Sequence, residues 1–164
     1  MIKIFREIYN ELEGWSLHLA GSASEGDKPY LDELKKLAKK IPVNFYPNLS
    51  YEELIKLYGE SSIYWHAAGF GEDDPTRMEH FGITTVEAMA AGCIPVVIGK
   101  GGQLEIVKNR ESGFLWNTID QLKQYTIKLT NQESLRREVA LSAIKRAQDF
   151  SKENFEQSLK EIIK

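Results

Sequence analysis

Residues 79–97 read EHFGITTVEAMAAGCIPVV. Gly82 can adopt the positive φ that a tight turn needs, and the residues that follow it are good helix formers. Thr84 and Glu87 have the spacing of a capping box, which predicts a helix over residues 84–91. A glycine and a proline soon after it end that helix and lead into an apolar strand.

The start of this helix is a candidate anion site. The first backbone amides of a helix have no partner within it, so residues 82–85 form a ready site for a phosphate group. Glu79 would lie just before that site, and Glu87 within the first turns of the helix. A purely structural interpretation is also open, in which Glu87 is only a capping partner and Glu79 is a solvated acid in a loop.

The composition is that of a globular protein. The chain has 164 residues, which suits a single domain, with 42% hydrophobic and 27% charged residues. Its net charge of −3 does not favour nucleic acid or an anionic membrane as a partner. No apolar run approaches the roughly 20 residues that span a bilayer, and the N-terminus lacks the apolar core of a signal peptide. The single cysteine, Cys93, excludes an internal disulfide and is expected to be a buried small hydrophobe.

Apolar periodicity and turn residues predict alternating strands and helices. The predicted strands are residues 15–21, 42–47, 62–66, 94–98 and 113–116. The predicted helices include one opened by a second capping box, Ser50 with Glu53, and three C-terminal helices over 119–129, 132–149 and 152–163. This order predicts a doubly wound, Rossmann-like α/β domain, with a parallel sheet that carries helices on both faces. Ligands of such sheets bind at the carboxyl ends of the strands.

Other motifs argue against competing functions. The chain lacks the Gly-x-Gly-x-x-Gly pattern of dinucleotide-binding domains and the spacing of cysteine and histidine in zinc sites. The acidic run at residues 72–74 could suggest a metal site, but it lacks the alternating ligands of a calcium loop and is better interpreted as a solvated surface. A receiver-like signalling domain would need an acid at the end of the first strand, where Gly21 stands.

The sequence resembles the retaining glycosyltransferases of family 4, which have the GT-B fold. The segments that carry the resemblance are LHLAG (17–21), VNFYPNLSYEEL (43–54), EHFGITTVEAMAAGCIPVV (79–97), GGQLEIV (101–107) and SGFL (112–115). The third and fourth segments are highly specific together, whereas the first two are weak alone. The resemblance extends over nearly the whole chain.

This resemblance implies that residues 1–164 are the C-terminal, nucleotide-sugar-binding half of a GT-B enzyme. Glu79 would contact hydroxyls of the donor sugar and is the candidate catalytic residue. The other candidate donor-binding residues are Phe81, Gly82, Ile83, Thr84, Glu87, His66, Pro47, Asn48, Gly101 and Gly102. The substrate would be a nucleoside diphosphate sugar, and neither a cofactor nor a metal is expected. The transfer would retain the anomeric configuration, with the leaving diphosphate assisting the incoming hydroxyl.

The resemblance implies that two parts of such an enzyme lie outside this chain. The family's basic clamp for the diphosphate and its N-terminal acceptor domain both lie upstream of the matching segments. We therefore expect the isolated chain to be inactive, and the full-length enzyme to be cytoplasmic and peripheral to a membrane. The final helix packs on the other half in two-domain relatives, so Phe155, Leu159, Ile162 and Ile163 are expected to form an exposed apolar stripe.

Three enzymatic or binding alternatives stay open. The first is a non-catalytic nucleotide-sugar-binding module that serves a partner subunit. The second is half of a GT-B-type sugar epimerase. A hydrolase that uses a pair of carboxylates is less favoured, because Glu87 in a capping box makes a poor second catalytic acid.

Overall fold

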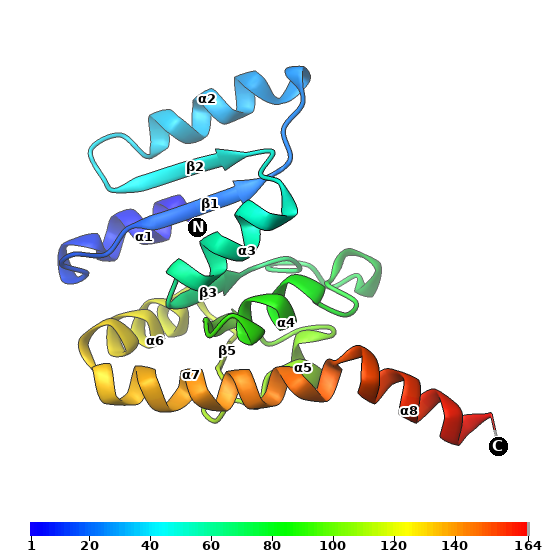
Figure 1. The fold of residues 1–164 in the computed structure, drawn as a ribbon. Helices are drawn as coiled ribbons and strands as arrows, with labels where there is room; N and C mark the ends of the chain where they lie inside the picture. Colours follow the sequence, from blue (N-terminus) through cyan, green and yellow to red (C-terminus); the bar gives the residue numbers. More distant parts are fainter. Residues whose placement is uncertain (164) are drawn as a thin grey trace. The chain divides into compact units, whose positions relative to one another are not determined.

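A computed structural model describes residues 1–163 of the chain. These residues form two compact units, Met1–Leu57 and a second unit that begins at Tyr58, and each is described by itself (Figure 1). Both units combine parallel strands with helices, so the α/β fold class is as expected. The backbone hydrogen bonds between strands fall in two sheets, whereas a single sheet was expected.

The first unit holds a pair of parallel strands. Its elements are α1 (Ile2–Ile8), η1 (Tyr9–Glu11), β1 (Leu17–Gly21), η2 (Glu25–Asp27), α2 (Lys28–Leu37), β2 (Val43–Pro47) and the start of α3 (Tyr51–Glu60). The two strands pair in register from Leu17 opposite Val43 to Gly21 opposite Pro47.

The capping box predicted at Ser50 and Glu53 is confirmed. The Ser50 amide donates to the Glu53 carboxylate at 2.8 Å, and the Glu53 amide donates to the Ser50 hydroxyl at 3.3 Å. These reciprocal bonds give partners to two backbone amides near the start of α3.

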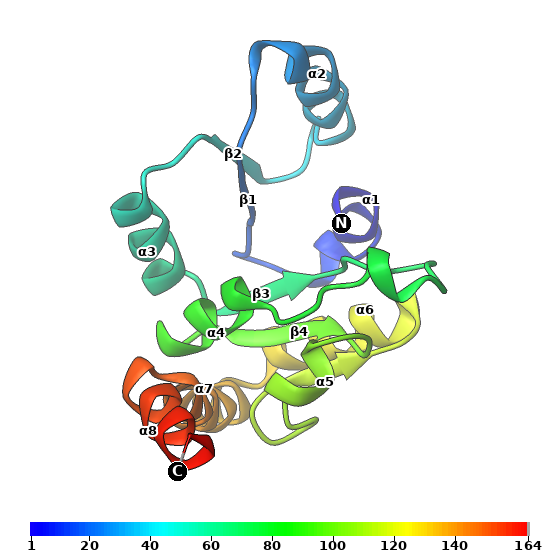
Figure 2. The same ribbon diagram turned by 90° about the vertical axis from the view of Figure 1, so that its right-hand side faces the viewer.

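The second unit is built on a parallel sheet of order β3-β4-β5. Its elements are β3 (Ile63–His66), η3 (Pro75–Arg77), α4 (Ile83–Ala90), β4 (Ile94–Ile98), α5 (Gln103–Ile106), β5 (Phe114–Trp116), α6 (Ile119–Asn131), α7 (Glu133–Ala147), η4 (Gln148–Phe150) and α8 (Lys152–Ile162). Strand β4 is buried along its whole length, as expected for a central strand of a parallel sheet. Figure 2 shows α4 beside this strand, with which it is in contact.

Helices cover both faces of this sheet. Neighbouring residues of a strand point to opposite faces. On β3, the hydroxyl of Tyr64 donates to Thr84 of α4 at 2.8 Å, and the indole of Trp65 donates to Thr126 of α6 at 2.9 Å. Helices α4 and α6 therefore lie on opposite faces, which confirms this part of the predicted architecture.

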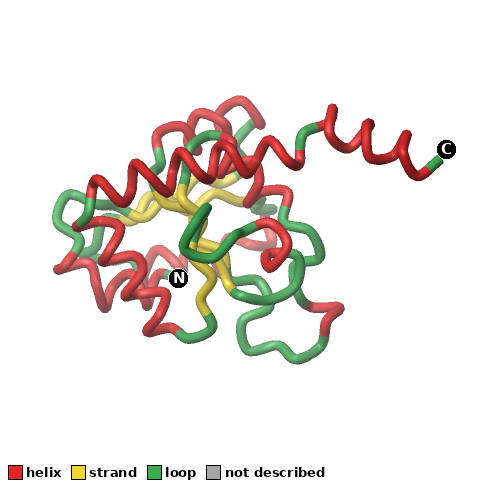
Figure 3. The backbone as a smooth tube through the Cα atoms, turned by 90° about the horizontal axis from the view of Figure 1, so that it is seen from below, coloured by secondary structure: helices red, strands yellow, loops and turns green. Residues whose placement is uncertain are grey.

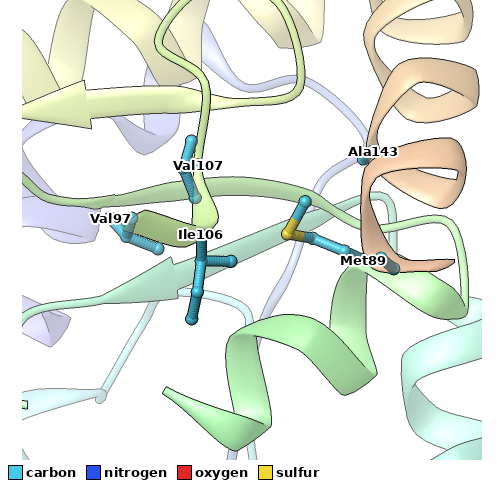
Figure 4. Packing of buried hydrophobic residues seen from close by; sticks show 6 residues of the cluster. Met89, Val97, Ile106, Val107 and Ala143 are labelled. Atoms are coloured by element: carbon cyan, nitrogen blue, oxygen red, sulfur yellow. The ribbon is translucent and has the colours of Figure 1, made fainter. Parts of the chain in front are cut away.

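The core on the α4 face joins the sheet to α7. Its buried members are Met89, Val97, Ile106, Val107, Ala143 and Ala147 (Figure 4). Small residues on α7 let this helix approach α4 and β4 closely, and the thioether of Met89 fills the space between them. This packing fixes the strand ends and the helix starts that form the candidate site.

The last helix lies apart from this core. Helix α8 continues beyond the end of α7 and extends away from the sheet (Figures 1 and 3). The apolar residues predicted to be exposed here are exposed: Phe155, Leu159, Ile162 and Ile163. Among the helices of the described residues, none combines the length and the apolar composition that crossing a bilayer requires.

Candidate functional site

A carboxylate and an imidazole form the centre of the site. His66 ends β3, and its Nε2 lies 3.6 Å from Oε2 of Glu79. The other oxygen of Glu79 accepts from the backbone amide of Phe81 at 3.3 Å. Burial lowers the pKa of His66, and the charge of Glu79 partly offsets that effect. The ring is therefore neutral near pH 7. Each oxygen of the Glu79 carboxylate has a neighbour: Oε2 faces the imidazole and Oε1 accepts from the Phe81 amide.

The turn into α4 supplies backbone donors next to this pair. Gly82 has φ of 100° and is the N-cap residue of the helix, which begins at Ile83. The amide of Thr85 donates to the carbonyl of Gly82 at 3.0 Å, so it is already used inside the helix. The predicted anion site thus narrows from residues 82–85 to residues 82–84, whose amides precede the first intrahelical bond.

The predicted capping box at Thr84 is wrong. The helix begins one residue earlier than expected, so Thr84 lies inside its first turn rather than at the N-cap. The hydroxyl of Thr84 instead accepts from the phenol of Tyr64 at 2.8 Å. The physical reason is that the carbonyl of Gly82 already accepts the first helical bond, and its left-handed backbone conformation sets the helix start.

Tyr64 is a site residue that the sequence analysis missed. Its ring stacks on that of His66, with centroids 6.3 Å apart. Burial raises the pKa of Tyr64; hydrogen bonding to the threonines at the start of α4 opposes this rise, and the charges of Glu79 and Glu87 add to it. Both predicted carboxylates therefore act on the same phenol. The signal in the sequence was strand alternation, which places Tyr64 and His66 on one face.

The Gly101-Gly102 turn contacts the main chain of residues 79–81. The Gly102 amide donates to the carbonyl of Glu79 at 2.8 Å. A Cβ atom built on Gly102 would lie 2.6 Å from the carbonyl oxygen of Phe81 and closer still to that of His80. Gly101 has φ of 57°, and a Cβ atom built on it would collide with the carbonyl oxygen of Glu79. Close backbone contact explains both glycines, and their contact with a donor stays a prediction.

Gln103 is the second site residue that the sequence analysis missed. It follows the two glycines and is completely buried. Its Nε2 lies 3.4 Å from Nδ1 of His66, on the side of the ring away from Glu79. The site in the second unit thus gathers residues from the end of β3, from the turn before α4 and from the start of α5.

Phe81 and Ile83 leave apolar surface at the site. Phe81 is 48% exposed and Ile83 is 64% exposed. The ring of Phe81 meets that of Phe150 edge to face, with centroids 6.0 Å apart. Their backbone positions agree with the predicted donor site, while their contact with a ligand stays a prediction.

Pro47 and Asn48 belong to the first unit. Asn48 has φ of 59°, and its side-chain amide exchanges two hydrogen bonds of 2.8 Å with the backbone of Ala23. It therefore holds the loop after β1 against the end of β2. The predicted position of Pro47 and Asn48 beside a nucleobase stays a prediction.

The loop between β3 and α4 is tied down by polar contacts. The ammonium group of Lys100 donates to the backbone carbonyl of Glu72, and Arg77 pairs with the Glu72 carboxylate at 3.5 Å. Asp74 caps η3 by accepting from Thr76. Within residues 1–163, no group of three or more histidine, cysteine, aspartate or glutamate side chains is placed to hold a metal ion.

Comparison with known protein families identifies the chain. The family model described as "Glycosyl transferases group 1" matches residues 1–146. The chain belongs to this family. A GDP-Man:Man(3)GlcNAc(2)-PP-Dol alpha-1,2-mannosyltransferase from Dictyostelium discoideum is 30% identical to this group 1 glycosyl transferase over 89% of the chain. The protein of the same name from Xenopus laevis is 34% identical over 84% of the chain. The chain spans 28% of the length of each of these relatives.

Solved structures share the fold of this glycosyl transferase. The C-terminal domain of a glycosyl transferase group 1 family protein from Francisella tularensis has a TM-score of 0.73 at 20% identity; the match covers 90% of this chain and 75% of that one. The Anabaena protein Alr3699/HepE, solved in complex with UDP and glucose, has a TM-score of 0.78 at 22% identity, over 98% of this chain and 44% of that one. The expected fold, one half of a GT-B glycosyltransferase, is confirmed.

Proposed function

We propose that this group 1 glycosyl transferase domain binds a nucleoside diphosphate sugar, and that the whole protein transfers the sugar to a glycan or lipid-linked acceptor. The observation that carries the proposal is the position of the Glu79 carboxylate, which lies 3.6 Å from His66 and accepts from the Phe81 amide just before α4. That arrangement joins an acceptor for sugar hydroxyls to donors for a diphosphate.

Each part of the site has a role in this proposal. The amides of residues 82–84 and the positive end of the α4 dipole bind the diphosphate and stabilise the charge that it gains as the glycosidic bond breaks. Glu79 accepts hydrogen bonds from the donor sugar, and Glu87 accepts them from the ribose. The transfer proceeds with retention, because the leaving diphosphate receives the proton of the incoming hydroxyl on the same face of the sugar. No metal ion takes part.

The relatives suggest a donor. Both mannosyltransferases described above are named for GDP-mannose and for a dolichol-linked glycan. We therefore take GDP-mannose as the first donor and a lipid-linked glycan as the acceptor class. The acceptor side of the site would come from an N-terminal GT-B domain, without which this chain is inactive. A cytoplasmic location, with the whole enzyme peripheral to a membrane, belongs to the same proposal.

Calorimetric titration of the chain with GDP-mannose, GDP and UDP-glucose tests the donor site. A charged hydrogen bond contributes about 1.5–3 kcal/mol, so Glu79→Gln and Glu87→Gln should each weaken binding by roughly 10- to 100-fold. Glu138→Gln, an exposed site on α7, is the matched control and should bind as the wild type does.

Two outcomes would contradict the proposal. One is an absence of binding for every nucleotide sugar at millimolar concentration. The other is equal affinity in the two site variants and the control. Adding EDTA should leave the affinity unchanged, whereas a loss of binding that Mg²⁺ restores would overturn the metal-independent mechanism.

A further inference from the structure

Gln103 is buried in a way that ordinary packing does not explain. It begins α5 and is completely buried, yet its Oε1 has no hydrogen-bond partner among the described residues. Burying a polar atom without a partner costs free energy, and glutamine is among the residues that are mostly exposed. A leucine would fill a similar volume without that cost. The carboxamide therefore calls for a role that a hydrocarbon cannot perform.

The carboxamide of Gln103 lies next to the residues at the centre of the candidate site. Its Nε2 is 3.4 Å from Nδ1 of His66. A Cβ atom built on Gly82 would lie 2.8 Å from the same nitrogen, so the side chain of Gln103 also occupies the space below the turn into α4. Gln103 thus contacts two parts of the site, the imidazole and the glycine turn.

The chemistry of the imidazole fixes the direction of this contact. The amide nitrogen of Gln103 can only donate, so Nδ1 of His66 accepts and the proton of the neutral ring lies on Nε2. That nitrogen faces Oε2 of Glu79 at 3.6 Å. With the carboxamide reversed, a neutral ring would carry its proton on Nδ1 and would turn a lone pair toward the carboxylate, which is repulsive.

We propose that Gln103 is a positioning residue, which holds His66 in its Nε2–H tautomer and thereby directs the carboxylate of Glu79. The partners that face the ring agree with this role: Glu79 lies at one nitrogen, Gln103 lies at the other, and Tyr64 stacks on its face. The consequence for donor binding rests on the function proposed above. The tautomer itself does not.

NMR of the ¹⁵N-labelled chain without nucleotide tests the tautomer directly. In the wild type at pH 8, Nδ1 of His66 should have a pyridine-type shift and Nε2 a pyrrole-type shift. Gln103→Met keeps the volume and removes the donor, so both shifts should move toward the average of two exchanging tautomers. Unchanged shifts in Gln103→Met would overturn the proposal.

A second variant reverses the polarity at the same position. Gln103→Glu places an acceptor beside Nδ1, which favours the doubly protonated ring and should raise the pKa of His66 by at least about 1. Gln124→Glu, on an exposed site of α6, adds the same charge away from the site and is the control. An equal pKa of His66 in these two variants would overturn the proposal even if Gln103→Met fails to fold.

Titration with GDP-mannose then separates this inference from the proposed function. If the wild type binds, Gln103→Met should weaken binding by roughly tenfold, which corresponds to the loss of one hydrogen bond. If the wild type does not bind but the tautomer responds as expected, the donor-site proposal fails and the positioning role of Gln103 stands.

Discussion

Replacing Gly102 by alanine tests the contact that supports Glu79. The backbone of Gly102 has φ of −59° and ψ of −18°, which alanine adopts without strain. The new methyl group, however, would lie 2.6 Å from the carbonyl oxygen of Phe81. Since nonbonded contacts normally lie about 3.5 Å apart, the two backbones must separate by roughly 1 Å.

The size of the effect follows from what must move. Overpacking a tight contact costs about 1–3 kcal/mol, and the upper half of that range applies because the obstacle is backbone rather than a flexible side chain. For a domain of this size, each kcal/mol lowers Tm by roughly 2–4 °C, so Gly102→Ala should lower it by about 4–12 °C. The same shift displaces the main chain of Glu79 and should weaken donor binding.

Thermal unfolding followed by circular dichroism measures the change. Gly59→Ala is the control, because Gly59 lies in α3 and, within the described part of the chain, no heavy atom beyond its chain neighbours and the helix backbone lies within 4 Å of a Cβ built there. This control should gain about 0.5–1 kcal/mol from the higher helix propensity of alanine. A Gly102→Ala protein with the Tm and the donor affinity of the wild type would refute the role assigned to this contact.

Two further predictions concern the cysteine and the last helix. Burial raises the pKa of Cys93 to about 12, and its thiol donates to the carbonyl of Tyr58. The cysteine of the denatured chain has a pKa near 8.5, so at pH 8 a thiol reagent should label the native chain about 10³-fold more slowly than the denatured chain. Equal labelling rates would contradict this prediction. Phe155 and Ile162 are 67% and 82% exposed, so we expect the chain to self-associate through α8 as its concentration rises. Replacing both residues by serine should reduce the association measured by sedimentation and leave Tm unchanged; equal association in wild type and variant would show that α8 is not the contact.

The arrangement of strands and helices was predictable because it depends on local patterns. Glycine and proline end segments, and alternation of apolar residues marks strands, so the element order holds along the chain with ends that differ by a few residues. The three C-terminal helices, for example, were expected over 119–129, 132–149 and 152–163 and lie at Ile119–Asn131, Glu133–Ala147 and Lys152–Ile162.

The two capping boxes show where sequence patterns reach their limit. Ser50 and Glu53 form the predicted box, and Ser50 immediately precedes the first residue of α3. Thr84 and Glu87 have the same spacing, but Gly82 precedes them in a left-handed conformation and its carbonyl accepts the first helical bond. Spacing alone cannot choose between Gly82 and Thr84 as the N-cap residue. The choice depends on the left-handed backbone of Gly82, where a Cβ atom would meet the side chains of Gln103 and Ile106.

The sequence predicted the central residues of the candidate site but not the side chains that pack against them. Glu79, Gly82 and His66 were recognised because they stand in specific motifs or at strand ends. Tyr64 and Gln103 were not, because a strand residue and a residue after a glycine pair have no motif of their own. Their roles arise from contacts between elements distant in sequence, such as the bond from Tyr64 to Thr84 and the approach of Gln103 to His66.

The two specific motifs are best understood as one physical unit. The turn before α4 and the turn before α5 contact each other through backbone atoms: the Gly102 amide bonds to Glu79, and both glycines lie where a side chain would strike residues 79–81. Backbone contacts of this kind are stiffer than contacts between side chains. The main chain of Glu79 is therefore positioned by two residues that have no side chain. Gln103, the next residue after Gly102, acts on the Glu79 carboxylate through His66. A variant of either turn should disturb the other, so substitutions at Gly102 and Gln103 should not be additive in their effect on the environment of His66.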